Sequence, residues 1–507
     1  GVVESADLFV MENGATLQTT ETVTQGSPMK MEGKDGGCVE NLKDFIVETP
    51  VEGTLLTKKG DGWMKLNTVC PSLERLAING GTVQCVACDR PAQTVEFISG
   101  TLYENTGSSY AIHVPEGGSG TWSLANRSTY NNKITGEGTL TIYCAVEHGN
   151  GWFATRTPVA VNLSLFTGTI NATADMADSY PRFTLNTSSG MPDGTLNITA
   201  GVTVQNTGRT FRIGKLAGKG TLGGYASFAN DGATGVNTWQ VGCDDDFAWA
   251  GTVTANSKFE KVGSGKMTVS GVWDNTGEVA VKEGTLCLND RSAENAMLGS
   301  GELSVEDGAV LCGMGKLGNA SVTVERGGRL YSGTREGASS GTLDFSGKRL
   351  TVSTGGEVLF NVASKVRCTT LEGISSFSLR GTLKVSVREG LELEAGDEFQ
   401  LWVANRTALS SACTLDLDSP GEGLEWDTSA LENGILKVKT ATGITGVVSG
   451  EPVDCVVYTL DGARAGSFTC MPSEVGEYME RNGFRSGMYM VKMTQGQRTE
   501  SRKVTVD

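Results

Sequence analysis

The chain has 507 residues, of which 69 are glycine and only 11 are proline, and its formal net charge is −16. An acidic surface repels the phosphate backbone, so this charge argues against nucleic acid as a partner. No apolar run reaches the roughly eighteen residues of a membrane-spanning helix, so we expect no membrane span. Abundant glycine with little proline favours short strands joined by tight turns, and the best helical pattern is a short one at residues 471–480.

Two segments of the chain repeat one phrase. Residues 58–66 (KKGDGWMKL) align with residues 261–269 (KVGSGKMTV), and a Gly-Thr-apolar phrase follows each copy at the same distance, at Gly81 and Gly284. Each unit predicts a short strand with one buried face, and one such rung buries that face only when others stack on it. Weaker Gly-x-apolar-x-apolar copies begin at Gly138, Gly194, Gly301, Gly381 and Gly434.

Period-two alternation runs from about residue 8 to residue 438 and predicts an all-β fold. We expect a long right-handed parallel β-helix (a solenoid) in residues 1–440, a linker in 441–452 and a small C-terminal β-sandwich in 453–507. Thr, Ser, Lys and Glu should occupy the outward positions. The inward positions should include the apolar residues that follow turn glycines, namely Leu286, Leu303, Val305, Leu343 and Leu383.

A resemblance to a known family covers much of this region. Residues 261–288 resemble the autotransporter-associated β-strand repeat, in which a Lys-x-Gly-x-Gly strand and a polar turn precede a Gly-Thr-Leu strand. Residues 311–438 are similar to the C-terminal end of autotransporter-type passengers, with the phrases GMG at 313–315, GDEF at 396–399 and GLEWDT at 423–428. The resemblance implies a β-helix displayed at a bacterial surface.

The C-terminal tail has a different pattern. Residues 455–462 (CVVYTLDG), 487–493 (GMYMVKM) and 502–506 (RKVTV) predict three strands, the first closed by an Asp-Gly turn. This tail resembles the C-terminal sorting domain of the type IX secretion system of Bacteroidetes. The resemblance implies a protein that is secreted or held at the cell surface, outside the outer membrane, and that contacts the outer-membrane secretion machinery through residues 453–507.

One loop combines residue types that suit sugar binding. Residues 147–153 (EHGNGWF) interrupt the strands and hold one of the two histidines beside a tryptophan. Aromatic faces in such loops stack on sugar rings, so Glu147, His148 and Trp152 are the candidate ligand-binding residues. The alternative is a plug of Trp152 and Phe153 that closes the end of a coil.

The densest carboxylate run is the candidate metal site. Asp244, Asp245 and Asp246 stand between two strand patterns, and carboxylate oxygens are the ligands that calcium prefers. The alternative is a solvated turn. No cofactor other than this calcium is indicated.

The twelve cysteines show no disulfide-framework spacing, so we interpret them as small buried residues. Cys85 and Cys88 form the one CxxC phrase. Positions i and i+3 of a strand face opposite ways, so we expect the two thiols to lie apart and not to form a zinc site.

No nucleophile elbow with a histidine base is visible, and the catalytic residues stay unassigned. The sequence favours a non-enzymatic, adhesin-like or scaffold β-helix outside the cell, with extracellular glycans or a host surface bound on a side wall. The alternative is a polysaccharide-active enzyme, either a glycoside hydrolase or a lyase, or the ancillary domain of an enzyme whose catalytic part lies upstream.

Overall fold

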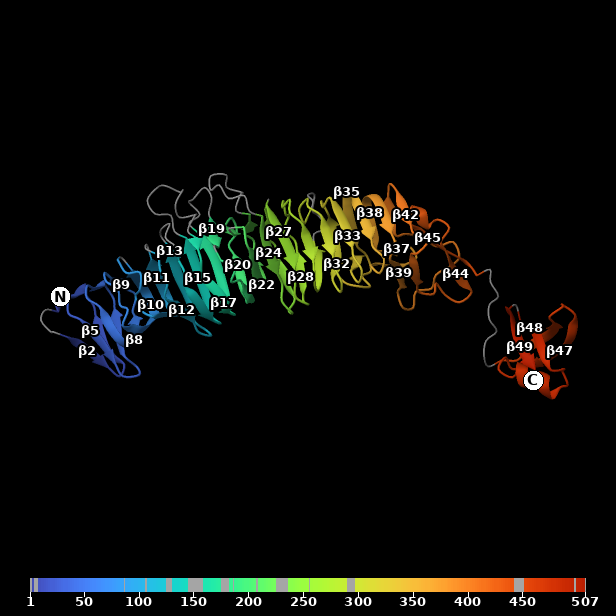
Figure 1. Cartoon of the computed structure of the whole chain (residues 1–507), viewed down its shortest axis with the longest axis horizontal. Helices are drawn as coiled ribbons and strands as arrows, with labels where there is room; N and C mark the ends of the chain where they lie inside the picture. The colour runs from blue at the N-terminus through green and yellow to red at the C-terminus, as the bar shows by residue number, and fades with distance from the viewer. Residues whose placement is uncertain are drawn as a thin grey trace.

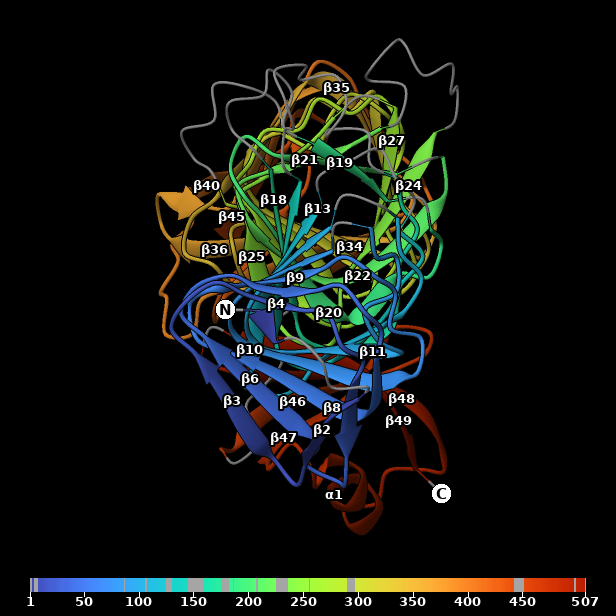
Figure 2. The same ribbon diagram turned by 90° about the vertical axis from the view of Figure 1, so that its left-hand side faces the viewer.

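The computed structural model confirms the expected all-β fold, a long parallel β-helix followed by a small antiparallel unit (Figure 1). The N-terminal strands lie at one end of the rod, and each later coil stacks on the one before it. Figure 2 looks along the rod from its N-terminal end. The structure describes residues 2–3, 8–85, 87–104, 107–124, 130–144, 158–174, 182–185, 187–206, 208–224, 236–254, 256–289, 297–441, 451–496 and 498–506.

Two parallel ladders, which follow one another along the rod, are here together called the first wall. Its strands in the N-terminal half are β1 (Val2–Val3), β4 (Val23–Gln25), β7 (Phe45–Val47), β9 (Trp63–Leu66), β10 (Leu73–Cys85), β11 (Thr94–Glu104), β13 (Ser119–Leu124), β15 (Thr139–Cys144), β18 (Thr169–Ala174), β20 (Met191–Ile198) and β22 (Thr210–Gly218). It continues in β25 (Phe247–Trp249), β28 (Lys266–Val269), β30 (Thr285–Asn289), β32 (Val310–Lys316), β34 (Arg329–Ser332), β36 (Glu357–Ser364), β39 (Thr382–Val387) and β43 (Thr414–Leu417).

A second wall is built in the same way, and long strands such as β10 and β11 bend to serve both walls. Its other strands are β2 (Phe9–Glu12), β3 (Ala15–Thr19), β5 (Met29–Glu32), β6 (Gly37–Asn41), β8 (Val51–Lys59), β12 (Ala111–Val114), β14 (Lys133–Gly136), β17 (Asn162–Phe166), β24 (Asn237–Val241), β27 (Ser257–Lys261), β29 (Val279–Val281), β31 (Leu303–Val305), β33 (Ser321–Val324), β35 (Thr342–Val352), β38 (Thr370–Leu379), β41 (Trp402–Ala404) and β42 (Thr407–Leu409). A shorter sheet contains β16 (Pro158–Val159), β19 (Arg182–Leu185), β21 (Thr203–Asn206), β23 (Thr221–Gly223) and β26 (Thr252–Val253).

Apolar side chains stack between the coils and form one continuous core. Leu286, Leu311, Leu330, Val358 and Leu383 are register partners on successive rungs, and each is fully buried. Burying one such side chain contributes about 1.5–3 kcal/mol, so the rungs stabilise one another. The burial of the five residues predicted to face inward is thereby confirmed: Leu286, Leu303, Val305, Leu343 and Leu383 are at most 1% exposed.

The repeated phrase buries a lysine, although lysines were expected on the outside. Lys58 is fully buried, and its Nζ donates hydrogen bonds to the carbonyl oxygens of Lys59 (2.8 Å), Gly60 (2.7 Å) and Gly80 (3.3 Å). Gly81, the first residue of the Gly-Thr phrase, has φ of +60°, and a Cβ there would lie 2.4 Å from the Gly60 carbonyl oxygen. The phrase therefore encodes a turn whose carbonyls hold an ammonium group.

The second copy of the phrase repeats this arrangement. Lys261 is fully buried, and its Nζ donates to the carbonyl oxygens of Val262 (2.9 Å), Gly263 (2.7 Å) and Glu283 (3.1 Å). Gly284 again has a positive φ, of +65°. Burial lowers the pKa of both lysines, Lys58 and Lys261, to about 8, because an ammonium group loses hydration in the interior.

The parallel ladders end before residue 440. An antiparallel sheet of β40 (Glu398–Gln400), β45 (Ile435–Thr440) and β44 (Leu424–Asp427) follows them, with the short helix η3 (Leu431–Asn433). Phe399, Leu431 and Leu436 belong to the rod's own core, so this sheet covers the end of the stack. Earlier, β37 (Arg367–Cys368) pairs antiparallel with the end of β36.

The C-terminal unit is an antiparallel sheet with the strand order β47-β46-β48-β49. Its strands are β46 (Val453–Thr459), β47 (Arg464–Cys470), β48 (Gly487–Gln495) and β49 (Arg498–Val506), and the predicted helical pattern forms α1 (Val475–Arg481). Val475 and Met479 of α1 pack into a separate hydrophobic core with Val457 and Val491. Helix α1 thus covers the sheet, and β47 is a strand that the sequence pattern did not reveal.

Candidate functional site

Polar side chains form a straight column on the outside of the first wall. Register partners on successive strands place Thr82, Thr101, Thr121, Thr141, Asn171 and Asn197 in line, and these six residues are called the threonine column. The residues that follow them in sequence, such as Leu102 and Trp122, are fully buried. The alternation of a strand therefore points the column outward, with members about 4.8 Å apart.

A second polar column lies beside the first. Ser119, Thr139, Thr169 and Thr195 are register partners two residues earlier on the same strands, and all four are at least partly exposed. The asparagines at the far end of the threonine column link into a ladder, in which Asn197 Nδ2 donates to Asn171 Oδ1 (2.8 Å) and Asn171 Nδ2 to Thr141 Oγ1 (3.4 Å). The wall thus presents two parallel rows of hydroxyl and amide groups.

The wall is hollowed where the two columns run side by side. An open groove of about 390 Å³ is lined by Gly100, Thr101, Ser119, Gly120, Thr121, Thr139, Thr141 and Asn171. Gly120 has to be glycine, because a Cβ there would lie 2.2 Å from Cδ1 of the buried Phe97. At Gly100 a Cβ would also meet the preceding rung, 2.8 Å from the Gly81 carbonyl oxygen, so both glycines are needed for close stacking of the rungs beneath the groove. All of the lining residues are uncharged, so the groove suits a neutral ligand with many hydroxyl groups.

Two aromatic residues lie on the same wall near the groove but outside its lining. Trp63 is the register partner of Thr82, so it continues the threonine column, and it is 40% exposed. Tyr103 of β11 is half-buried, and its ring centroid lies 6.4 Å from that of Trp63. A sugar ring has an apolar face and hydroxyl groups at its edge. Aromatic rings near hydroxyl side chains can contact the face and bond the edge.

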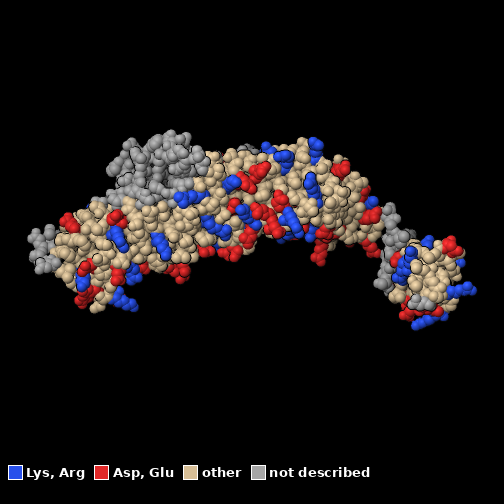
Figure 3. Space-filling model, in the orientation of Figure 1, with Lys and Arg blue, Asp and Glu red and all other residues tan. Residues whose placement is uncertain are grey.

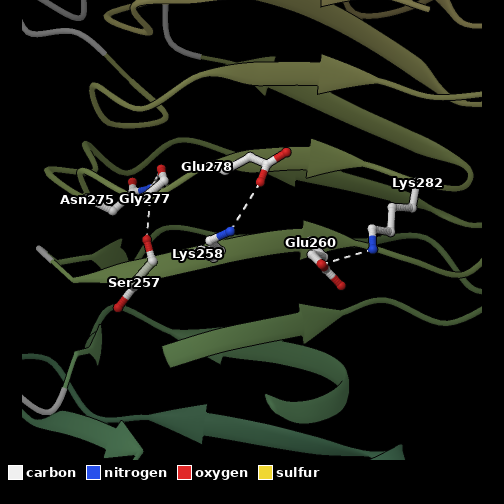
Figure 4. A network of polar contacts seen from close by, with 7 residues as sticks. All are labelled: Ser257, Lys258, Glu260, Asn275, Gly277, Glu278 and Lys282. Carbon is white, nitrogen blue, oxygen red and sulfur yellow. Dashed lines mark hydrogen bonds and ion pairs between the residues drawn. The ribbon is translucent and has the colours of Figure 1, made fainter. Parts of the chain in front are cut away.

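The second wall carries charged pairs that the groove lining lacks. Lys258 and Glu260 of β27 pair with the two residues that flank β29: Lys258 with Glu278 (3.3 Å) and Glu260 with Lys282 (2.9 Å), as Figure 4 shows. In the same view the buried Asn275 donates to the carbonyl oxygens of Ser257 and Gly277. The visible face in Figure 3 carries both signs of charge interspersed. Exposed pairs of this kind contribute little stability, about 0–1 kcal/mol, and they neutralise one another.

The predicted aspartate run is an exposed bend whose three carboxylates face different protein donors. Asp244 Oδ1 accepts from Ser264 Oγ (2.7 Å), Asp245 pairs with Lys215 Nζ (2.6 Å), and Asp246 Oδ1 accepts from the Lys266 backbone N–H (2.8 Å). Hydrogen bonds from Ser264 lower the pKa of Asp244. Within the described ranges no group of three His, Cys, Asp or Glu side chains converges as metal ligands.

The other predicted site, Glu147, His148 and Trp152, lies outside the described residues. Sequence reasoning missed the groove. Its signal in the sequence is Thr-x-Thr at Thr139 and Thr141 and Thr-x-Asn at Thr195 and Asn197, but the repeats alone do not show that these side chains align between rungs.

The CxxC expectation was wrong in its geometry. Strand β10 ends at Cys85, so the alternation of a strand stops there, and Cys88 lies beside Cys85 in the core. The hydrogen bond between the two thiols and their burial raise the pKa of Cys85. The interpretation of the cysteines as small buried residues fits the eleven whose side chains the structure describes, which are free and mostly buried.

No protein-family model matches the chain, and no curated protein matches it. The helices in the described part of the chain all fall short of the length and apolar character that a membrane crossing requires. Fold and wall together define the class as a parallel β-helix protein with a polar, grooved side wall.

Proposed function

We propose that this protein is an adhesin-like β-helix that works outside the cell and binds neutral glycans in the groove of its first wall. The observation that carries the proposal is the alignment of Thr101, Thr121, Thr141 and Asn171 on successive rungs of an uncharged groove. Because the column follows the axis of the rod, a polysaccharide chain lies along it and meets one polar side chain per rung.

The groove binds its ligand and does not cleave it. Glycoside hydrolysis needs two carboxyl groups flanking the scissile bond, and lyases need a base near the sugar ring. The residues that line the groove supply hydroxyl, amide and backbone groups only. This composition favours the adhesin-like function over a polysaccharide-active enzyme.

Delivery to the cell surface is the second part of the proposal. The C-terminal unit has its own hydrophobic core, which includes Val453, Val457 and Val491, apart from the core of the rod. A unit with a separate core folds independently of the rod, as a detachable sorting domain must. The resemblance of residues 453–507 to type IX sorting domains points in the same direction.

Affinity measurements with purified polysaccharides test the glycan proposal. Neutral chains (dextran, a soluble β-glucan and mannan) should include a ligand, whereas the acidic polygalacturonate should bind weakly because the protein has a net charge of −16. Thr121→Val and Thr141→Val remove one hydroxyl each at nearly constant shape and should each weaken binding about fivefold, from a hydrogen bond of about 1 kcal/mol.

The matched control is Thr351→Val, which removes a partly exposed hydroxyl from β35 of the second wall. It should leave the affinity unchanged. Equal affinities for all three variants and the unaltered protein would place the glycan elsewhere, and new reducing ends released from a neutral polysaccharide would favour the enzyme.

A further inference from the structure

Two cysteines occupy neighbouring rungs of the first wall, far along the rod from the groove. Cys287 of β30 and Cys312 of β32 are register partners, and both are fully buried free thiols. They alternate with the inward Leu286 and Leu311, so they point to the outer side of the wall. Register partners on parallel strands lie about 4.8 Å apart, within the Cα separation of about 4.4–6.8 Å that a disulfide accepts.

A loop at residues 333–341 covers the two thiols. The carbonyl oxygen of Thr334 accepts from Lys266 Nζ (2.5 Å) and from Cys287 Sγ (3.8 Å). Two further contacts hold the loop: Glu336 pairs with Arg329 (2.8 Å), and the Ala338 carbonyl oxygen accepts from Asn361 Nδ2 (2.8 Å). A cavity of about 10 Å³ lies beneath it, which is room for about one water molecule.

The surroundings make the two thiols unequal. A hydrogen bond from Cys312 and the charge of the Lys266 ammonium lower the pKa of Cys287, although burial opposes them. The same hydrogen bond and burial raise the pKa of Cys312. A dithiol of this kind has a defined attacking sulfur and a defined resolving sulfur.

We propose that Cys287 and Cys312 form a redox-active dithiol that closes to an intrachain disulfide by exchange with a small-molecule disulfide, with Lys266 as the cation that holds the Cys287 thiolate. The thiolate attacks one sulfur of the small disulfide, which gives a mixed disulfide and releases one thiolate that takes up a proton. Cys312 then gives its proton to solvent and attacks Sγ of Cys287, which releases the second thiol. Both cysteines are oxidised, and the small disulfide is reduced to two thiols.

The chain contains its own matched control in Cys85 and Cys88. These two thiols are also neighbours and fully buried, but they lie near the carboxyl group of Glu104, which disfavours a thiolate. Both pairs require opening of the structure before a reagent reaches them. Selective oxidation of the Cys287 pair would therefore reflect its cation and its covering loop and not burial alone.

The test incubates the native full chain with oxidised glutathione, blocks the remaining thiols by alkylation and identifies linked peptides by mass spectrometry. We expect a peptide that joins Cys287 to Cys312 and none that joins Cys85 to Cys88. Lys266→Met should slow the linkage at least about threefold, and Lys266→Arg should restore it. In Cys312→Ser the reaction should stop at the mixed disulfide between Cys287 and glutathione. In Cys287→Ser, Cys312 should stay unmodified.

Three results overturn the proposal. The first is the absence of the linked peptide in the native protein, and the second is equal linkage at Cys85 and Cys88. The third is an unchanged linkage rate in Lys266→Met, since the cation would then have no part in the exchange. The first two comparisons use the unaltered protein, so they stand even if a variant fails to fold.

Discussion

Replacing Glu104 by Gln should change how the stability of the rod depends on pH. Glu104 ends β11 and is fully buried, and its Oε2 accepts hydrogen bonds from Trp122 Nε1 (2.6 Å) and Ser108 Oγ (3.1 Å). Its Oε1 has no partner in the part of the chain that the structure describes. Burial raises the pKa of this carboxyl group to about 7, because the anion loses hydration that two donors do not replace.

The sign and size of the effect follow from linkage. The pKa of Glu104 is about 7 in the folded protein against the ordinary 4.5 of an exposed glutamate, so the folded state binds the proton more tightly. Stability from this group is therefore fully present below pH 4.5 and is lost as the pH rises toward 7 and above. The loss is about 3 kcal/mol in all, of which about 2 kcal/mol falls between pH 5 and pH 7.

Urea unfolding followed by circular dichroism at pH 5 and pH 7 measures this loss. Glu104→Gln cannot ionise, so the free energy of unfolding of the unaltered protein, relative to the variant, should fall by about 2 kcal/mol between the two pH values. Glu116→Gln, at an exposed position, is the control and should show no such change. A difference between the Glu104 proteins that stays constant with pH would refute the argument from burial.

Three further predictions concern the stack, the buried lysines and the C-terminal unit. Leu303→Asp should reduce the free energy of unfolding by several kcal/mol and so lower the thermal midpoint, because the site is 1% exposed. An unchanged midpoint would contradict the stacking. In the unaltered protein, stability should rise by up to about 3 kcal/mol between pH 8 and pH 10.5, because the lowered pKa of Lys261 makes the folded state release its proton before the unfolded state does. Lys261→Met should abolish this gain, and denaturation at both pH values checks it. Deleting residues 453–507 should leave the rod folded but retain it in the periplasm. Cell fractionation that finds the truncated rod at the surface, or a truncated rod that is unfolded, would disprove this.

The sequence by itself determined the rungs and their inward faces. Leu303 and Val305 follow a turn glycine at period two, and in a strand that period assigns the buried face without knowledge of the neighbours. The repeated phrase likewise identified equivalent turns at Lys58 and Lys261. It could not reveal that these lysines are buried, because the carbonyl oxygens that hold them come partly from the next rung, through Gly80 and Glu283.

Only the tertiary structure decided which side chains meet on the walls. Thr141 and Asn171 become neighbours because the turns between their strands have particular lengths, and a change of one residue in register would turn either side chain to the other face. Cys287 and Cys312 meet for the same reason, and a loop from a later rung covers them. Contacts within a rung follow from local alternation, whereas contacts between rungs depend on the register of the stack, which the sequence specifies only through the whole fold.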